Sequence, residues 1–233
     1  MKTHAKHYYS YAVILLLVFL LPSYQVSAAD RNSDALKQLS ARWWQWSLSI
    51  PVDTNPLLDT TGENCMVGQN GPIWYLAGIL GQGAATRTCS IPQDKTLFFP
   101  IVNNMFFDSP NVCQGPDSIP LADLRKFVAD GTNQITFTSV TLDGKPVRFV
   151  KRVSSVVFAV TLPEHNVFDE PCIAAGVGQV PAGVYSPAVD EGYYAVIRSL
   201  DAGAHALHFV AKAGDTVVQD VTYDLNILPV KLK

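Results

Sequence analysis

The stretch Val217–Ile227, VVQDVTYDLNI, alternates apolar and polar side chains, and this alternation decides the fold class. One parity is apolar apart from Gln219, and its other members are Val217, Val221, Tyr223, Leu225 and Ile227. The opposite parity is polar from residue 220 on, through Asp220, Thr222, Asp224 and Asn226. Because successive side chains of a strand point to opposite faces, the pattern predicts a strand with one buried face and one wet face.

The same signal recurs upstream. Apolar and polar residues alternate in residues 154–162 and 204–211. Within residues 134–150, the pair Asp143-Gly144 separates two β-rich runs, which predicts a hairpin with a two-residue turn.

Two nearly continuous apolar runs, residues 72–80 and 95–103, are predicted to be central strands covered on both faces. Glycine and proline recur at short intervals, as in chains with many short strands and tight turns. We therefore predict a mainly β fold of about eight strands, a single antiparallel β-sandwich, immunoglobulin-like or jelly-roll-like, over residues 29–233.

An amphipathic helix is predicted over residues 32–48, ending before Pro51. At about 100° per residue, Trp43 and Trp46 fall on its apolar stripe and are predicted core residues. Trp44 lies off the stripe, and three interpretations stay open: packing under a loop or strand, contact with a partner protein, or stacking on a sugar.

One further short helix is predicted over residues 118–131, with Pro120 near its first turn and Gly131 as its C-terminal cap. The sandwich is thus expected to carry two helices. The change from helical to alternating periodicity after residue 131 marks the return to strands.

The first residues predict a secretory signal, residues 1–28. Lys2 and Lys6 precede the apolar run 12–21, and small residues follow at positions 26–28. Ten helical residues rise only about 15 Å, about half the hydrocarbon core of a bilayer. We expect a secreted protein, periplasmic or extracellular, with no membrane span in the mature chain.

Four cysteines, Cys65, Cys89, Cys113 and Cys172, follow the predicted signal. An even number in an exported chain predicts two disulfides, for which three pairings exist. We favour Cys65–Cys89 and Cys113–Cys172, since each pair joins neighbouring segments without crossing the other.

The predicted signal holds two lysines and no acid, so its removal changes the net charge from −3 to −5. A negative balance argues against a nucleic-acid partner, because such binding requires clustered positive charge. The basic set Lys145, Arg148, Lys151 and Arg152 is better interpreted as a solvated face of a strand pair than as a polyanion site.

No metal site or cofactor is predicted. His205 and His208 are three apart on a predicted strand and point to opposite faces, so they cannot share a metal ion. His205 follows an Asp-x-Gly turn, where many immunoglobulin-like domains have a tyrosine that bonds back across the corner, and a turn-bonding role is expected for it.

Carboxylate pairs are the remaining route to an enzyme. Asp220 and Asp224 share a face but are separated by about 13 Å along a strand, too far for a glycosidase pair. Asp169-Glu170 and Asp190-Glu191 are interpreted as turn residues in loops. We therefore lean against an enzyme.

Several motifs together resemble a group of exported bacterial proteins with a tryptophan-rich N-terminal helix and a closing GxHxLHF…DVTYxL strand pair. These motifs are WWQW (43–46), RTCSIP (87–92), TLFFPIVN (96–103), SPAVDEGYY (186–194), SLDAGAHALHF (199–209) and DVTYDLNI (220–227). The resemblance spans most of the mature chain. It implies an exported single-domain protein and no particular reaction.

The sequence thus predicts a non-catalytic binding or assembly role at or outside the cell envelope. The partner would be a protein, a glycan or a second copy of the chain, with Trp44 and His205 as candidate binding residues. Two alternatives stay open: a glycan hydrolase that uses loop carboxylates, and a filament subunit joined by strand addition at residues 219–230.

Overall fold

The computed structural model describes residues 28–198 and 200–229, with side chains from Asn32 onward. Residues 1–27, which hold the predicted signal segment up to its last residue, lie outside the described residues. None of the described helices is long and apolar enough to cross a membrane.

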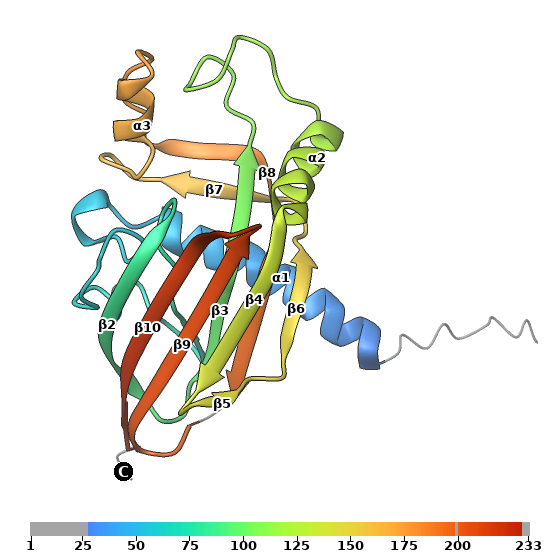
Figure 1. The fold of residues 1–233 in the computed structure, drawn as a ribbon. Coiled ribbons are helices and arrows are strands. Elements are labelled where there is room, and N and C mark those ends of the chain that lie inside the picture. The colour runs from blue at the N-terminus through green and yellow to red at the C-terminus, as the bar shows by residue number, and fades with distance from the viewer. Residues whose placement is uncertain (1–27, 199, 230–233) are drawn as a thin grey trace, which may run out of the picture.

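The described strands form two five-stranded sheets that pack together (Figure 1). Sheet A has the order β1 (Ile73–Tyr75), β3 (Thr96–Phe107), β8 (Gly183–Arg198) and β6 (Val150–Ser154), and β7 (Phe158–Leu162) pairs with the beginning of β8. Sheet B has the order β2 (Gly83–Pro92), β10 (Thr216–Leu228), β9 (Gly203–Ala213), β4 (Ile135–Leu142) and β5 (Lys145–Pro146).

The predicted mainly β sandwich is confirmed, but its sheets are mixed rather than wholly antiparallel. The pairs β1–β3 and β2–β10 are parallel, and the other described strand pairs are antiparallel. Alternation in the sequence indicates which face of a strand is buried and carries no information on strand direction, so the parallel pairs were missed.

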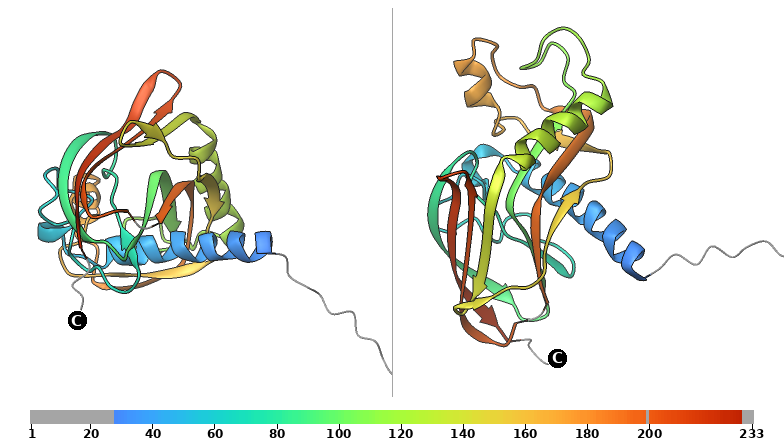
Figure 2. Two further views of the ribbon diagram at one scale, coloured as in Figure 1. Left: turned by 90° about the horizontal axis from the view of Figure 1, so that it is seen from below. Right: turned by 45° about the vertical axis from the view of Figure 1, so that its right-hand side comes forward.

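Helix α1 (Ala28–Leu48) lies across the face of sheet A that points away from sheet B (Figure 2). Sheet A is therefore buried on both faces, with one apolar core against α1 and another against sheet B. In β3, Phe98 belongs to the first core, and its neighbours Leu97 and Phe99 belong to the second. This explains the continuous apolar run at residues 95–103, which is a central strand as predicted.

The strand that decides the fold class is β10. Its predicted apolar face is buried at Val221, Tyr223, Leu225 and Ile227. Val217 is 41% exposed, because the register shifts between Val217 and Gln219. β10 lies between β2 and β9 and is paired with both over residues 219–227. The hypothesis of strand addition at this segment is therefore wrong, since it has no free edge.

The tryptophans of α1 attach the helix to three separate parts of the chain. Trp43 Nε1 donates to the Leu76 carbonyl (2.9 Å), Trp44 Nε1 to Asp190 Oδ1 (2.7 Å) and Trp46 Nε1 to the Val67 carbonyl (3.0 Å). Each of these three helix indoles therefore has a partner for its N–H, the usual arrangement for a buried tryptophan.

The predicted hairpin is confirmed: Asp143 and Gly144, with φ of 50° and 72°, connect β4 and β5 as a two-residue turn. Its two positive φ values are those of a type I′ turn, for which Asp-Gly is a preferred pair. The second predicted helix is α2 (Leu121–Asn133), which extends beyond Gly131; the C-cap is Gln134 rather than Gly131.

Both acidic pairs interpreted as turn residues lie in regular elements. Asp169 and Glu170 lie in the first turn of α3 (Asp169–Ala174), where the positive end of the helix dipole stabilises negative charge. Asp190-Glu191 lie inside β8, and Asp190 is fully buried. Acidic pairs beside glycine or proline are typical of turns, and tertiary packing overrode that preference here.

Residues 72–80 were predicted to be a central strand, but only Ile73–Tyr75 is a strand, and it lies at the edge of sheet A. The chain beyond it is irregular, and sheet B side chains satisfy its backbone. Arg87 donates to the carbonyls of Ala77 and Gly78, Tyr223 donates to the Ala77 carbonyl, and Gln219 bonds both the N–H and the carbonyl of Ile79. These bonds replace a β ladder.

The two disulfides join Cys65 to Cys89 and Cys113 to Cys172, which is the pairing the spacing favoured. The first ties the loop before β1 to β2 of sheet B. The second ties the loop after β3 to α3. Each bridge fastens an irregular segment to a regular element.

Candidate ligand-binding cleft

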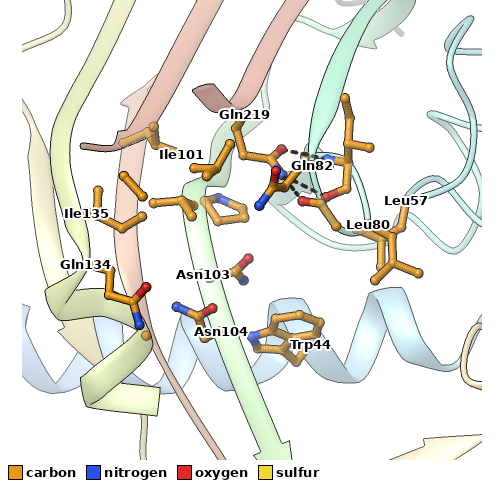
Figure 3. Close-up of a pocket in the computed structure, with 18 residues that line it drawn as sticks. Trp44, Leu57, Leu80, Gln82, Ile101, Asn103, Asn104, Gln134, Ile135 and Gln219 are labelled. Atoms are coloured by element: carbon orange, nitrogen blue, oxygen red, sulfur yellow. Dashed lines mark hydrogen bonds between the residues drawn. The ribbon is translucent and has the colours of Figure 1, made fainter. Parts of the chain in front are cut away.

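A cleft of about 420 Å³ opens between the end of sheet B and the layer formed by β3 and α1 (Figure 3). Its volume lies within the range of small-molecule sites. Trp44 and parts of five other segments line it: Leu57, residues 78–82, residues 100–104 of β3, Gly131 with residues 134–135 after α2, and the β9–β10 turn region at 213 and 218–219.

The polar lining of the cleft consists of carboxamides. The polar side chains of the lining are Gln82, Asn103, Asn104, Gln134 and Gln219. Both ends of the Gln219 carboxamide are bonded to backbone groups of residues 79 and 81. The remaining lining is apolar or glycine, and no lining side chain carries an acid, a base, a hydroxyl or a thiol. The cleft is therefore an uncharged surface that offers hydrogen bonds.

The Asn103 side chain is held by a chain of hydrogen bonds that runs into the core. Its Nδ2 donates to the Tyr194 hydroxyl (3.0 Å), which in turn donates to Asp190 Oδ1 (2.8 Å). The residue opposite Asn103 on β8 is Gly192, and a Cβ there would lie 2.6 Å from Asn103 Cα. Glycine at 192 thus makes room for the strand that carries Asn103.

Asn104 is held in a similar way by the end of α2. Its Nδ2 donates to Thr132 Oγ1 (3.3 Å), whose hydroxyl bonds the Val128 carbonyl (2.9 Å) and the Glu191 carbonyl (3.1 Å). A Cβ at Gly131 would lie 3.2 Å from the Asn104 carboxamide, tighter than ordinary contact. Gly131, predicted as a helix cap, instead lies inside α2 and leaves space for the Asn104 carboxamide next to the cleft.

Asp190 lies behind the cleft and is fully buried. Burial raises the pKa of this carboxyl to about 7, although the hydrogen bonds from Trp44 and Tyr194 act to lower it. The buried Oδ2 has no protein hydrogen-bond partner among the described residues. A carboxyl so placed is costly, and perturbed acids of this kind are found preferentially at functional sites.

Trp44 forms the floor of the cleft. It is only 6% exposed, and its N–H points into the core toward Asp190. This burial agrees with the interpretation of Trp44 as a residue that packs under a loop or strand. A direct binding role for Trp44 stays a prediction, and the mostly covered ring limits that role to its exposed edge.

His205, the other candidate binding residue, lies at the start of β9 and lines none of the cleft. Its ring nitrogens contact Asp143 Oδ2 (2.8 Å) and the Asp201 carbonyl (3.0 Å). These bonds raise the pKa of the imidazole, the Asp143 carboxylate contributing most. His205 therefore makes the turn contact expected of the corner residue, and a role in binding stays a prediction.

The residue types that bind metal ions, and the two acids considered as a carboxylate pair, lie apart in the described part of the chain. No group of three histidine, cysteine or acidic side chains placed to bind a metal occurs there. Asp220 contacts His208 (2.8 Å) on the outer face of sheet B, and Asp224 on the same face is exposed. Neither carboxylate reaches the cleft.

Sequence reasoning missed the cleft, although one signal for it was present. The apolar run of β3 ends in two adjacent asparagines, Asn103 and Asn104, before apolar residues resume at Met105. Asparagine is rare inside a buried strand, and two in succession indicate a place where the strand is no longer covered by other side chains. The other carboxamides come from segments far apart in the sequence, which no local pattern connects.

Comparison of the chain with protein-family models, with curated proteins and with solved structures found no match.

Proposed function

We propose that this protein is an exported binding protein whose cleft holds a small uncharged ligand without changing it chemically. The observation that carries the proposal is the lining, whose polar side chains are all carboxamides and which includes no ionisable side chain. Acid–base and nucleophilic catalysis require ionisable, hydroxyl or thiol groups at the ligand, and the lining supplies none. A charged ligand would be desolvated there without a counter-charge.

Export is supported by the disulfide-bonded two-sheet architecture, which is consistent with an oxidising compartment outside the cytoplasm. Cell fractionation of the expressed full-length chain tests this part of the proposal. We expect the oxidised protein in the periplasm or medium. Accumulation of a reduced, uncleaved chain in the cytoplasm would contradict export.

Binding is tested on the oxidised chain from residue 29 on, with matched sets of neutral, anionic and cationic small molecules. Neutral hydrogen-bonding compounds should raise the melting temperature, whereas the charged analogues should not. A Gln134→Trp variant, which places an indole at the exposed lip of the cleft, should abolish the effect. Gln38→Trp on the exposed side of α1 is the control and should bind normally. Equal stabilisation of both variants by the ligands would place binding elsewhere and refute the proposal.

A further inference from the structure

Resting on the proposed function, we infer that the cleft recognises a sugar through two fixed hydrogen-bond acceptors, the Oδ1 atoms of Asn103 and Asn104. The inference depends on which end of each carboxamide faces the ligand. That orientation follows from the donors and acceptors behind the two side chains.

Behind Asn103, the Tyr194 hydroxyl has a single proton, which it donates in a hydrogen bond to the Asp190 carboxyl at 2.8 Å. The hydroxyl oxygen is then free only to accept, so its other partner must be a donor. The group of Asn103 that contacts Tyr194 is therefore the amide nitrogen, at 3.0 Å. The Asn103 Oδ1 is left for the cleft.

Behind Asn104, the Thr132 hydroxyl is likewise committed as a donor, because its neighbours at 2.9 and 3.1 Å are the backbone carbonyls of Val128 and Glu191. Its oxygen accepts from the amide nitrogen of Asn104. As successive residues of β3, opposite Gly192 and Glu191 of β8, the two asparagines extend from opposite faces of the strand, and both border the cleft. Their carboxamide oxygens therefore approach a ligand from two sides, with orientations set by the core and by α2.

The other side of the cleft complements these acceptors. Gln82 and Gln134 are exposed and make no side-chain hydrogen bond within the described structure, so each can turn to donate or accept. Figure 3 shows Leu57 and Leu80 together across from Gln134, with the Trp44 ring below. The site therefore has acceptors that require O–H or N–H donors, two adaptable carboxamides, and an apolar wall.

A sugar ring matches this division, because its hydroxyls line the ring edge and its C–H groups form an apolar face. Each hydroxyl can donate to a fixed asparagine oxygen and accept from a glutamine. Preorganised acceptors favour such a ligand because little side-chain entropy is lost when it binds. A capped amino acid such as N-acetylalanine amide is the competing neutral class, but it has no continuous apolar face to lie against the leucines.

The test uses the oxidised chain from residue 29 on, labelled with ¹⁵N, and two kinds of probe at millimolar concentration: the methyl glycosides of glucose, galactose, mannose and N-acetylglucosamine, and N-acetylalanine amide. The reporters are the Trp44 indole N–H and the side-chain amides of Asn103 and Asn104, which lie at the site. We expect at least one glycoside to shift these resonances with saturation and the capped amino acid to leave them unchanged.

Asn103→Ala and Asn104→Ala should each weaken glycoside binding about three- to tenfold, as for loss of one hydrogen bond. Asn226→Ala, on the exposed outer face of sheet B, is the matched control and should bind normally. Tyr194→Phe tests the orientation itself: it removes the hydroxyl that holds the Asn103 amide, so it should weaken binding while leaving every group that touches the ligand in place.

The outcomes separate the two claims. If only the capped amino acid shifts the reporters, the sugar assignment is wrong and the neutral-ligand cleft stands. If no neutral probe of either class shifts them, both the assignment and the proposed function are overturned. If a glycoside binds but the asparagine variants bind it as well as the control does, recognition by the two oxygens is refuted.

Discussion

The carboxyl of Asp190 offers the sharpest test of how this core is built, because its replacement by asparagine removes an ionisation while preserving a shape. In the folded protein Oδ1 accepts from the Trp44 indole (2.7 Å) and the Tyr194 hydroxyl (2.8 Å), and the oxygen of an asparagine can accept both bonds. What Asp190→Asn removes is the titration of a fully buried group.

The pKa of Asp190 is about 7 in the folded protein against 3.8 for an unperturbed aspartate, and burial is the main cause. Since the folded-state pKa is raised, the folded protein holds a proton that the unfolded chain releases between about pH 4 and 7. Folding free energy therefore becomes less favourable by about 1.4 kcal/mol per pH unit in that window. Above pH 7 the loss levels off at about 4 kcal/mol.

Urea unfolding of the wild type and Asp190→Asn, followed by tryptophan fluorescence at pH 5, 6, 7 and 8, measures this effect. The free energy of unfolding of the variant minus that of the wild type should rise by roughly 3 kcal/mol from pH 5 to pH 8. Taking the difference cancels the titration of distant groups, including Asp59, Asp108 and Asp143, whose pKa values are lowered by hydrogen bonds.

Asp224→Asn, on the exposed outer face of sheet B, is the control and should leave stability within about 0.5 kcal/mol of the wild type at every pH. A difference between Asp190→Asn and the wild type that stays constant from pH 5 to 8 would refute the reasoning. It would mean that Asp190 ionises as easily in the core as in water. Arg125 of α2 interacts with Asp190 through its charge, but its guanidinium donates to the Ser155 carbonyl (2.7 Å) rather than to Asp190. The pKa of Asp190 is therefore still expected to be raised.

Three further predictions concern stability. Arg87→Met should lower the free energy of unfolding in urea by about 3 to 5 kcal/mol, because the buried guanidinium bonds the carbonyls of Asp59, Ala77 and Gly78. Arg198→Met at an exposed site should change it by less than about 0.5 kcal/mol, and equal effects would contradict the buried network. The double variant Cys65→Ser/Cys89→Ser should lose about 3 kcal/mol of unfolding free energy, because the bridge closes a loop of 24 residues. Calorimetry measures the effect, and an unchanged melting temperature would show that the bridge does not constrain the unfolded chain. The pKa of His205 is raised in the folded protein, so its stabilising contribution is present below about pH 6.5 and is lost as the pH rises through the folded value. His205→Gln should remove this pH dependence of stability. If the variant and the wild type show the same dependence, the contact between His205 and Asp143 is not its source.

Local patterns anticipated several elements of the fold correctly. The alternation around Tyr223, the Asp143-Gly144 turn and the tryptophan-bearing helix are each specified by neighbours in sequence, and the structure has all three. The errors lie where a segment's partners are distant. Residues 76–80 are apolar like a strand, yet they meet buried polar side chains of sheet B and are held without a ladder.

The candidate site shows the same division more sharply. Asn103 and Asn104 are visible in the sequence as an interruption of an apolar run, but their orientation depends on Tyr194 and Thr132. The acidic pair at 190–191 fits a turn by composition, and only packing reveals Asp190 as a buried acid.

The sequence by itself determined the elements whose signals repeat within a few residues: the alternating strands, the amphipathic helix, the hairpin turn and a cysteine set suited to two bridges. The tertiary structure alone decided which strands are neighbours and in which direction, where an uncharged cleft opens, and that a carboxyl is deprived of water. The physical reason is the separation along the chain over which each property is determined. Periodicity follows from backbone geometry over a few residues, whereas the pKa of Asp190 depends on burial beneath Trp44, which is 146 residues away along the chain.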